Sequence, residues 1–209
     1  MFGPLTLIAR DPIIFLVLVG AFLSGLILHN LVQARLLARL GDDAALLAGH
    51  GTLEPPAQLT LPGVLWYLLF GFGLPRAVPL RLTGRRAVLA LLAGPITLLL
   101  WALLLMVVKQ AQQAYLTGAD VVGQGLDKAA LACGLHALYF LVPLPPLDGG
   151  RALWAGGGPA VRRVLGQVGA AGPIACYILW LILTLSGAFQ QVAMPLTAGL
   201  RAVTGLLPF

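Results

Sequence analysis

Three polar side chains in an otherwise apolar chain have the residue types and spacing of a metal site: His29, Gln33 and Asp148. His29 and Gln33 are four positions apart, so on a helix they share one face. That spacing allows two side chains to bind one metal ion. Asp148 follows a proline-rich stretch, residues 143–146, that must interrupt a helix. Inside a membrane such a break has to be buried in protein or line a wet cavity, and there the carboxylate could serve as a third ligand.

The residue types limit what this site could do. Zinc hydrolysis needs three protein ligands, an open position for water and a base. Gln33 offers only a neutral carbonyl oxygen, which is a poor zinc ligand beside imidazole and carboxylate. Asn30 follows His29, and its amide cannot accept a proton near neutral pH. We therefore expect weak zinc binding and little or no peptide hydrolysis.

The elements that must position these residues are membrane helices. Of the 209 residues, 59% are hydrophobic and 10% charged, whereas a soluble domain has roughly 25% charged residues. Four apolar runs approach the ~20 residues that a spanning helix needs: residues 12–34, 86–108, 129–147 and 172–192. The run 61–73 is too short to span and suits a re-entrant or interfacial element, and residues 194–209 could lie on the membrane surface or pack against the bundle. We predict an all-α polytopic membrane protein with one membrane-embedded domain over residues 1–209.

The basic residues predict an orientation. With four spans, nine arginines fall on one side, and Arg10, Lys109, Lys128 and Arg201 fall on the other. Cytoplasmic loops of membrane proteins carry the excess of basic residues, so the N-terminus is expected outside. The net charge of +6 is explained by these loops and gives no reason to expect nucleic-acid binding.

Several motifs occur in a fixed order along the chain. They are the helix through His29, Arg39-Leu40-Gly41-Asp42, Gly51-Thr52-Leu53, Gly71-Phe72-Gly73 with Pro79, Ala93-Gly94-Pro95, and Pro143-Leu144-Pro145-Pro146-Leu147-Asp148-Gly149-Gly150-Arg151. In this order the chain resembles the site-2 protease family of intramembrane zinc metallopeptidases, above all its small bacterial and archaeal members. The resemblance covers about residues 12–155 and leaves C-terminal helices at 160–209 outside it.

The resemblance implies roles for positions that this chain has changed. The family has a general-base glutamate at the position of Asn30 and a histidine ligand at that of Gln33. Its N-P-x-x-H-x-D stretch reads Glu54-Pro55-Pro56-Ala57-Gln58-Leu59-Thr60 here, and an asparagine is replaced by Phe140. The resemblance therefore predicts the fold together with an impaired site, in which zinc would depend on His29 and Asp148.

The same resemblance implies a partner. Active relatives present a transmembrane or membrane-proximal segment of a client protein to the metal as an extended strand. In this chain the groove for it is expected at Gly71, Phe72, Gly73, Pro143, Pro145 and Pro146. We expect a protein of a bacterial or archaeal plasma membrane that binds such clients and cleaves them poorly or not at all.

Other readings remain open from the sequence. His29 and Asp148 could be an inherited hydrogen-bonded pair, and Gly149 and Gly150 could simply permit the turn after Asp148. A rearranged but active metallopeptidase could recruit His136 as a ligand and Glu54 as a base. His136 is more typical of a core histidine, and His50, in a glycine-flanked loop, is expected to be solvated. A small transporter or channel is a further alternative, although the chain lacks the internal repeats of that class.

Overall fold

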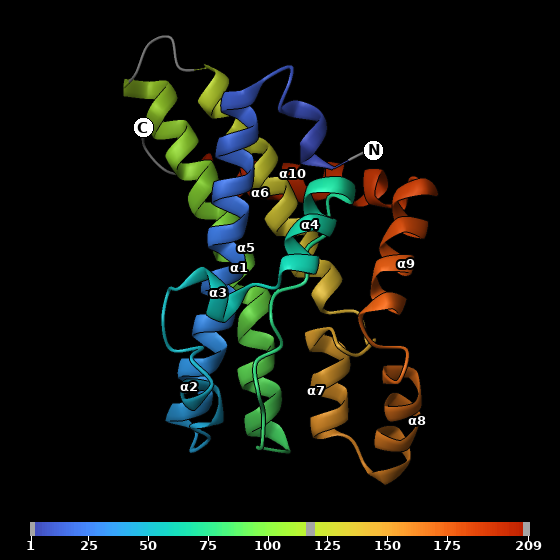
Figure 1. Cartoon of the computed structure of the whole chain (residues 1–209). Coiled ribbons are helices and arrows are strands. Elements are labelled where there is room, and N and C mark those ends of the chain that lie inside the picture. Colours follow the sequence, from blue (N-terminus) through green and yellow to red (C-terminus); the bar gives the residue numbers. More distant parts are fainter. Residues whose placement is uncertain (1–2, 116–119, 207–209) are drawn as a thin grey trace.

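The computed structural model describes residues 3–115 and 120–206, and these form helices joined by short loops and one extended segment (Figure 1). In chain order the elements are η1 (Pro4–Leu7), α1 (Pro12–Arg39), α2 (Ala44–Leu47), α3 (Pro55–Gln58), α4 (Leu61–Phe70), α5 (Arg85–Tyr115), α6 (Asp120–Phe140), α7 (Asp148–Gly156), α8 (Pro159–Gly169), α9 (Gly172–Leu185) and α10 (Ala188–Thr204). The described residues contain one isolated β-bridge, between Leu59 and Pro75. The predicted all-α class is confirmed.

Helices α1, α5 and α6 form the central bundle, and each contacts the other two. Their apolar runs begin at sites that favour helix starts, such as Pro12 at the first turn of α1. Small residues bring the helices close together: Gly25 of α1 faces Trp101 and Leu98 of α5, and Gly125 of α6 faces Val17 of α1. Such close approach of backbones is typical of helices that pack within a membrane.

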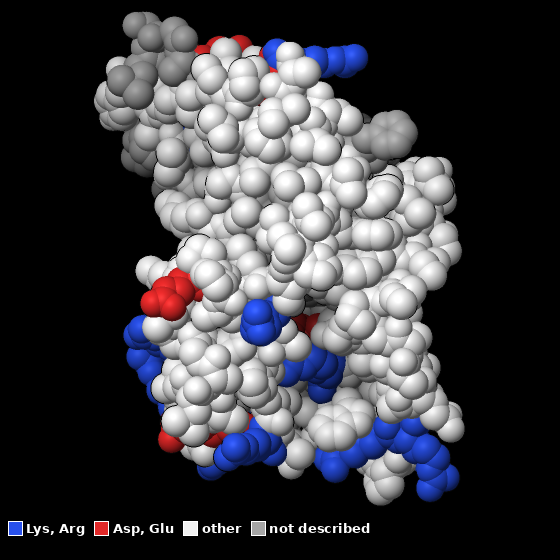
Figure 2. Space-filling model, viewed as in Figure 1, with Lys and Arg blue, Asp and Glu red and all other residues white. Residues whose placement is uncertain are grey.

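Two of the four predicted spans are present as helices long and apolar enough to cross a membrane, α1 and α5. Figure 2 shows a broad band without charged side chains across the upper half of this view, with charged side chains of both signs above it at the top edge and a larger number, mostly Lys and Arg, below it. Because α1 and α5 run in opposite directions, Arg39 at the end of α1 and Arg85 at the start of α5 lie at the same end of the bundle. The predicted grouping of these basic residues follows from this antiparallel arrangement.

The two remaining predicted spans differ from the sequence-based bounds. The run 129–147 corresponds to α6, which begins earlier, at Asp120, and ends at Phe140 before the prolines. The run 172–192 is not one helix: α9 ends at Leu185, and Gly187, with a φ of 77°, separates it from α10. With 14 residues, α9 is about 21 Å long, shorter than the ~30 Å hydrocarbon core. Helix α8 and α9 together could form a span bent by 78°.

The segment 61–73 is a short helix followed by extended chain, which agrees with the prediction that it cannot span. Thr60 caps α4 by accepting a hydrogen bond from the Gly63 amide at 3.1 Å, and Gly71 ends the helix with a φ of 76°. The chain then runs without helix through residues 72–83 to the start of α5. At the C-terminus, α10 packs on α5 and α6 and passes crosswise behind them (Figure 1).

Asp42 fastens this extended segment to the end of α1. Its Oδ2 accepts hydrogen bonds from the amides of Arg81 (2.6 Å) and Leu82 (2.9 Å). Its Oδ1 accepts one from the amide of Ala44 at 3.1 Å. Burial alone would raise the pKa of Asp42, but the three amide donors and the charge of Arg81 outweigh it, so the pKa lies below its ordinary value of 3.8.

We expect Asp42→Ala to lower the free energy of unfolding by about 2 kcal/mol, because hydrogen bonds to a charged group contribute about 1.5–3 kcal/mol. A pKa lowered in the folded state means that the contribution is complete above pH 3.8 and is lost as the pH falls through the folded pKa. Unfolding in detergent at pH 7 and at acidic pH measures both effects. The matched control is Asp43→Ala, since the exposed Asp43 makes no capping hydrogen bond. Equal losses in the two variants would contradict the assigned role of Asp42.

Candidate functional site

The fold brings together the four polar residues that the sequence singles out. His29, Asn30 and Gln33 are buried on the inner face of α1, and Asp148 is buried at the first residue of α7. His29 Nε2 lies 2.7 Å from Asp148 Oδ2. Helix periodicity places the three residues of α1 together. The proline-rich loop, with its cis Pro145–Pro146 bond, precedes α7 and brings Asp148 back to α1.

The orientation of the Asn30 amide is fixed by its partners. Its Nδ2 donates to the backbone oxygens of Gln58 (3.1 Å) and Arg76 (2.8 Å). Its Oδ1 therefore faces His29, whose Nδ1 lies 3.0 Å away and must donate to it. Asn30 thus ties α1 to α3 and to the extended segment. Its amide is already used in structural hydrogen bonds, and it has no group that could act as a base.

Gln33 is fully buried and only half satisfied. Its Nε2 donates to the Leu91 oxygen at 2.7 Å, whereas its Oε1 has no hydrogen-bond partner among the described residues. Helix α5 comes very close here: a Cβ on Gly94 would lie 2.4 Å from Gln33 Nε2 and 2.5 Å from His29 Nε2. The glycine of Ala93-Gly94-Pro95 is therefore needed for contact between α5 and the site.

These donors do not fit a zinc centre of the hydrolytic kind. Such a centre takes three protein ligands and leaves one position open, and here only His29 and Asp148 are good ligands. No group of three or more His, Cys, Asp or Glu residues that could hold a metal ion occurs in residues 3–115 and 120–206. Gln33 Oε1 is the one further oxygen that the predicted ligand set supplies.

His136, the replacement ligand of the rearranged peptidase, has hydrogen bonds at both ring nitrogens. Its Nδ1 lies 2.7 Å from the Ala132 oxygen, and its Nε2 accepts from the Gly73 amide at 3.3 Å. Both ring nitrogens are thus occupied, and the ring packs among Phe22, Phe72 and Trp180. Glu54, the candidate base of the same alternative, is exposed and does not line the cavity beside the site.

The expectation that His50 is solvated is wrong. His50 is 2% exposed, and its Nδ1 lies 3.2 Å from Gln58 Oε1. Gln58 in turn donates from Nε2 to the backbone oxygens of His50 and Thr52. Burial lowers the pKa of His50, the charges of Arg76 and Arg151 add to this, and the Gln58 hydrogen bond opposes it. The ring is therefore neutral and holds the loop that leads to α3.

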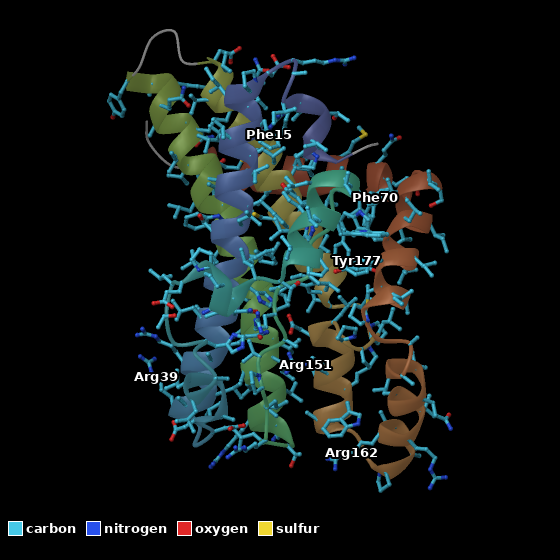
Figure 3. All side chains as sticks on the ribbon, in the orientation of Figure 1. Phe15, Arg39, Phe70, Arg151, Arg162 and Tyr177 are labelled. Atoms are coloured by element: carbon cyan, nitrogen blue, oxygen red, sulfur yellow. The ribbon has the colours of Figure 1, made fainter. Side chains whose placement is uncertain are left out.

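A cavity of about 330 Å³ opens beside the four residues. It combines their side chains with an extended wall, residues 74–78, and with residues from α7 and α9. Arg151 and Tyr177, which line it, are labelled in Figure 3. Of the predicted groove residues, Pro146 lines this cavity. Phe72 instead lies in the aromatic core, fully buried, and the Gly73 amide donates a hydrogen bond to His136. In this segment the cavity lining begins at Leu74.

Sequence reasoning missed the contribution of Arg151. Its guanidinium donates to the Val78 oxygen and lies 3.9 Å from Asp148 Oδ1. It thereby holds the extended wall against α7 and places a positive charge beside the carboxylate. The available signal was its position three residues after Asp148, which puts both side chains on one face of a helix.

Two curated relatives match most of the chain. The putative zinc metalloprotease YwhC of Bacillus subtilis (strain 168) is 30% identical over 205 residues, with 86% of this chain and 88% of the relative covered. The putative zinc metalloprotease Rip2 of Mycobacterium tuberculosis (strain ATCC 25618 / H37Rv) is 29% identical over 189 residues, with 86% and 72% covered. No family model matches the chain, and no solved structure matches it significantly.

Proposed function

We propose that this chain, which belongs to the site-2 protease family and is an integral membrane protein, binds transmembrane or membrane-proximal segments of client proteins without cleaving them. The observation that carries the proposal is the hydrogen bonding of Asn30. At the general-base position, Asn30 donates to the backbone oxygens of Gln58 and Arg76 and accepts from His29. General-base catalysis requires a group that can take a proton from water, and this amide cannot.

The ligand positions support the same conclusion. His29 and Asp148 hydrogen-bond each other at 2.7 Å, and Gln33 occupies the third ligand position with its amide nitrogen held by Leu91. A zinc ion would depend on His29 and Asp148, with the Gln33 carbonyl as a weak addition. Hydrogen bonds thus hold the elements together where a metal ion would do so in a protease.

The cavity supports binding of an extended segment. One wall is itself extended chain, residues 74–78, and several lining residues are apolar, including Val78, Phe140 and Tyr177. A client segment that leaves its helix near the membrane boundary could place apolar side chains there. Its freed backbone groups would need partners inside the protein, and the extended wall of residues 74–78 is the part of the cavity lining closest in form to such a segment.

We also propose an orientation of the protein in the membrane. The end of the bundle that carries Arg39 and Arg85 would face the cytoplasm of a bacterial or archaeal cell, and the N-terminus would face outside. The cavity then lies toward the cytoplasmic boundary, because His29 is 17 residues beyond Pro12, about 26 Å along α1. Clients would enter with a segment at that depth.

Site-specific photocrosslinking tests client binding. A photoreactive amino acid at Tyr177, which lines the cavity, is expected to crosslink membrane proteins in native membranes. The crosslinked peptides should map to transmembrane or juxtamembrane segments, and the clients should be intact. The matched control is the neighbouring Ile178, which is 54% exposed and does not line the cavity. Equal yields from the two positions, or cleaved clients, would overturn the proposal.

A further inference from the structure

A second polar feature of α1 lies on a different face from the site. Val32, Arg35, Leu36 and Arg39 follow the i, i+3, i+4, i+7 spacing of one helix face. Val32 and both arginines are exposed and Leu36 is partly so, whereas His29, Gln33 and Leu37 are buried against the bundle. This outer face therefore looks away from the protein core.

The outer face forms a groove with the loop after α2. The groove measures about 590 Å³ and is lined by Leu31, Val32, Arg35, Leu36, Arg39, Gly51, Thr52 and Leu53. Arg35 donates one hydrogen bond to the Gly51 oxygen at 3.1 Å. Neither Arg35 nor Arg39 has an ion pair within the described residues. Two guanidinium groups that are not in ion pairs within the described residues thus lie beside the apolar walls of the groove.

The depth of the groove relates these arginines to the membrane surface. No Asp, Glu, Lys or Arg occurs from Pro12 to Ala34, so the hydrocarbon core must surround this part of α1. Arg35 lies 23 residues beyond Pro12, about 35 Å along the axis. A hydrocarbon core of ~30 Å puts the guanidinium groups at headgroup level. Leu31 and Val32, one turn earlier, lie at the level of the acyl chains.

We propose that this groove binds an anionic glycerophospholipid. The phosphate lies between Arg35 and Arg39, since guanidinium groups match phosphate oxygens in charge and in hydrogen-bond geometry. The acyl chains cover the apolar walls, formed by Leu31, Val32 and Leu53. A free phosphate ion would use the arginines alone, so the apolar walls favour the lipid. Basic pockets at this depth are suited to anionic headgroups.

Native mass spectrometry of the full chain in detergent measures this binding. Titrated phosphatidylglycerol is expected to give one adduct with roughly tenfold higher affinity than phosphatidylcholine of the same chain length, because each basic residue near the surface favours an anionic headgroup. The Arg35→Gln/Arg39→Gln variant should lose roughly that tenfold preference. The control, Arg85→Gln/Arg86→Gln, removes two exposed charges from the same end of the bundle and should bind as the unsubstituted chain does.

One further variant and one competitor test the lipid site independently of the arginine substitutions. Leu53→Glu places a negative charge in the groove at a residue that is 62% exposed. It should weaken phosphatidylglycerol binding even if the double arginine variant folds poorly. Glycerol phosphate, which lacks acyl chains, should not compete at the same concentration. Equal binding by the two arginine pairs, full binding by Leu53→Glu, or competition by glycerol phosphate would each overturn the lipid site.

Discussion

The Gln33→His variant is expected to retain about one zinc ion per chain through purification, whereas the unsubstituted chain retains far less. The substitution adds an imidazole one helical turn after His29, on the same buried face. With Asp148 it gives three good ligands, as in catalytic zinc sites. The Gln33 side chain already lies against Gly94 beside His29 Nε2, so an imidazole at this position would lie close to the other nitrogen ligand. Hydrolysis is not expected, because Asn30 still provides no base.

Elemental analysis of detergent-purified protein measures this effect. The unsubstituted chain and the variant would be compared with Gln33→His/Asp148→Ala, which removes one ligand again and should return zinc to background. Near-stoichiometric zinc in the unsubstituted chain would show that His29 and Asp148 suffice as ligands without a third imidazole or carboxylate. No gain in the Gln33→His variant would mean that the His29–Asp148 hydrogen bond does not yield to a metal ion.

Local rules predict that His29 and Gln33 share one face of α1, but they do not place Asp148, which lies 119 positions from His29 and was expected there from the proline break and the resemblance. Two residues four apart share a helix face, and prolines stop a helix before Asp148. The hydrogen bonds of these residues could not be predicted in the same way. Asn30 and Gln33 donate to backbone oxygens 28, 46 and 58 positions away. Backbone oxygens are present at every residue, so their role leaves no pattern in the sequence.

Two predictions were wrong, the single span over 172–192 and the solvated His50, because each depends on a detail of backbone conformation or packing that the sequence pattern does not show. The apolar run 172–192 reads as one span, but Gly187 takes a positive φ between α9 and α10, and hydropathy does not register a single turn. His50 looked solvated because glycines flank it. In the structure His50 is buried and hydrogen-bonded to Gln58, and the resemblance identified Gln58 only as a substituted site position.

Gly149 and Gly150 show how a correct residue can be assigned an incomplete reason. The sequence suggested that they permit a turn, yet neither has a positive φ. What they permit is close approach: a Cβ on Gly149 would lie 2.1 Å from the Leu141 oxygen, and one on Gly150 would lie 2.4 Å from the Leu144 carbonyl carbon. The start of α7 therefore packs directly on the backbone of the proline-rich loop, and this contact sets the position of Asp148.

We accordingly expect Gly149→Ala to lower the free energy of unfolding by about 2 kcal/mol or more. Alanine favours a helix by up to ~1 kcal/mol over glycine, but overpacking costs ~1–3 kcal/mol, and occasionally more, where neighbours cannot move. Here the neighbours are backbone atoms. Reversible unfolding in a detergent titration measures the change. Gly166→Ala in α8 is the matched control, since nothing lies within 4 Å of its Cβ position, and it should be neutral or stabilising. A Gly149→Ala variant as stable as that control would mean that the loop yields easily and does not fix Asp148 against His29.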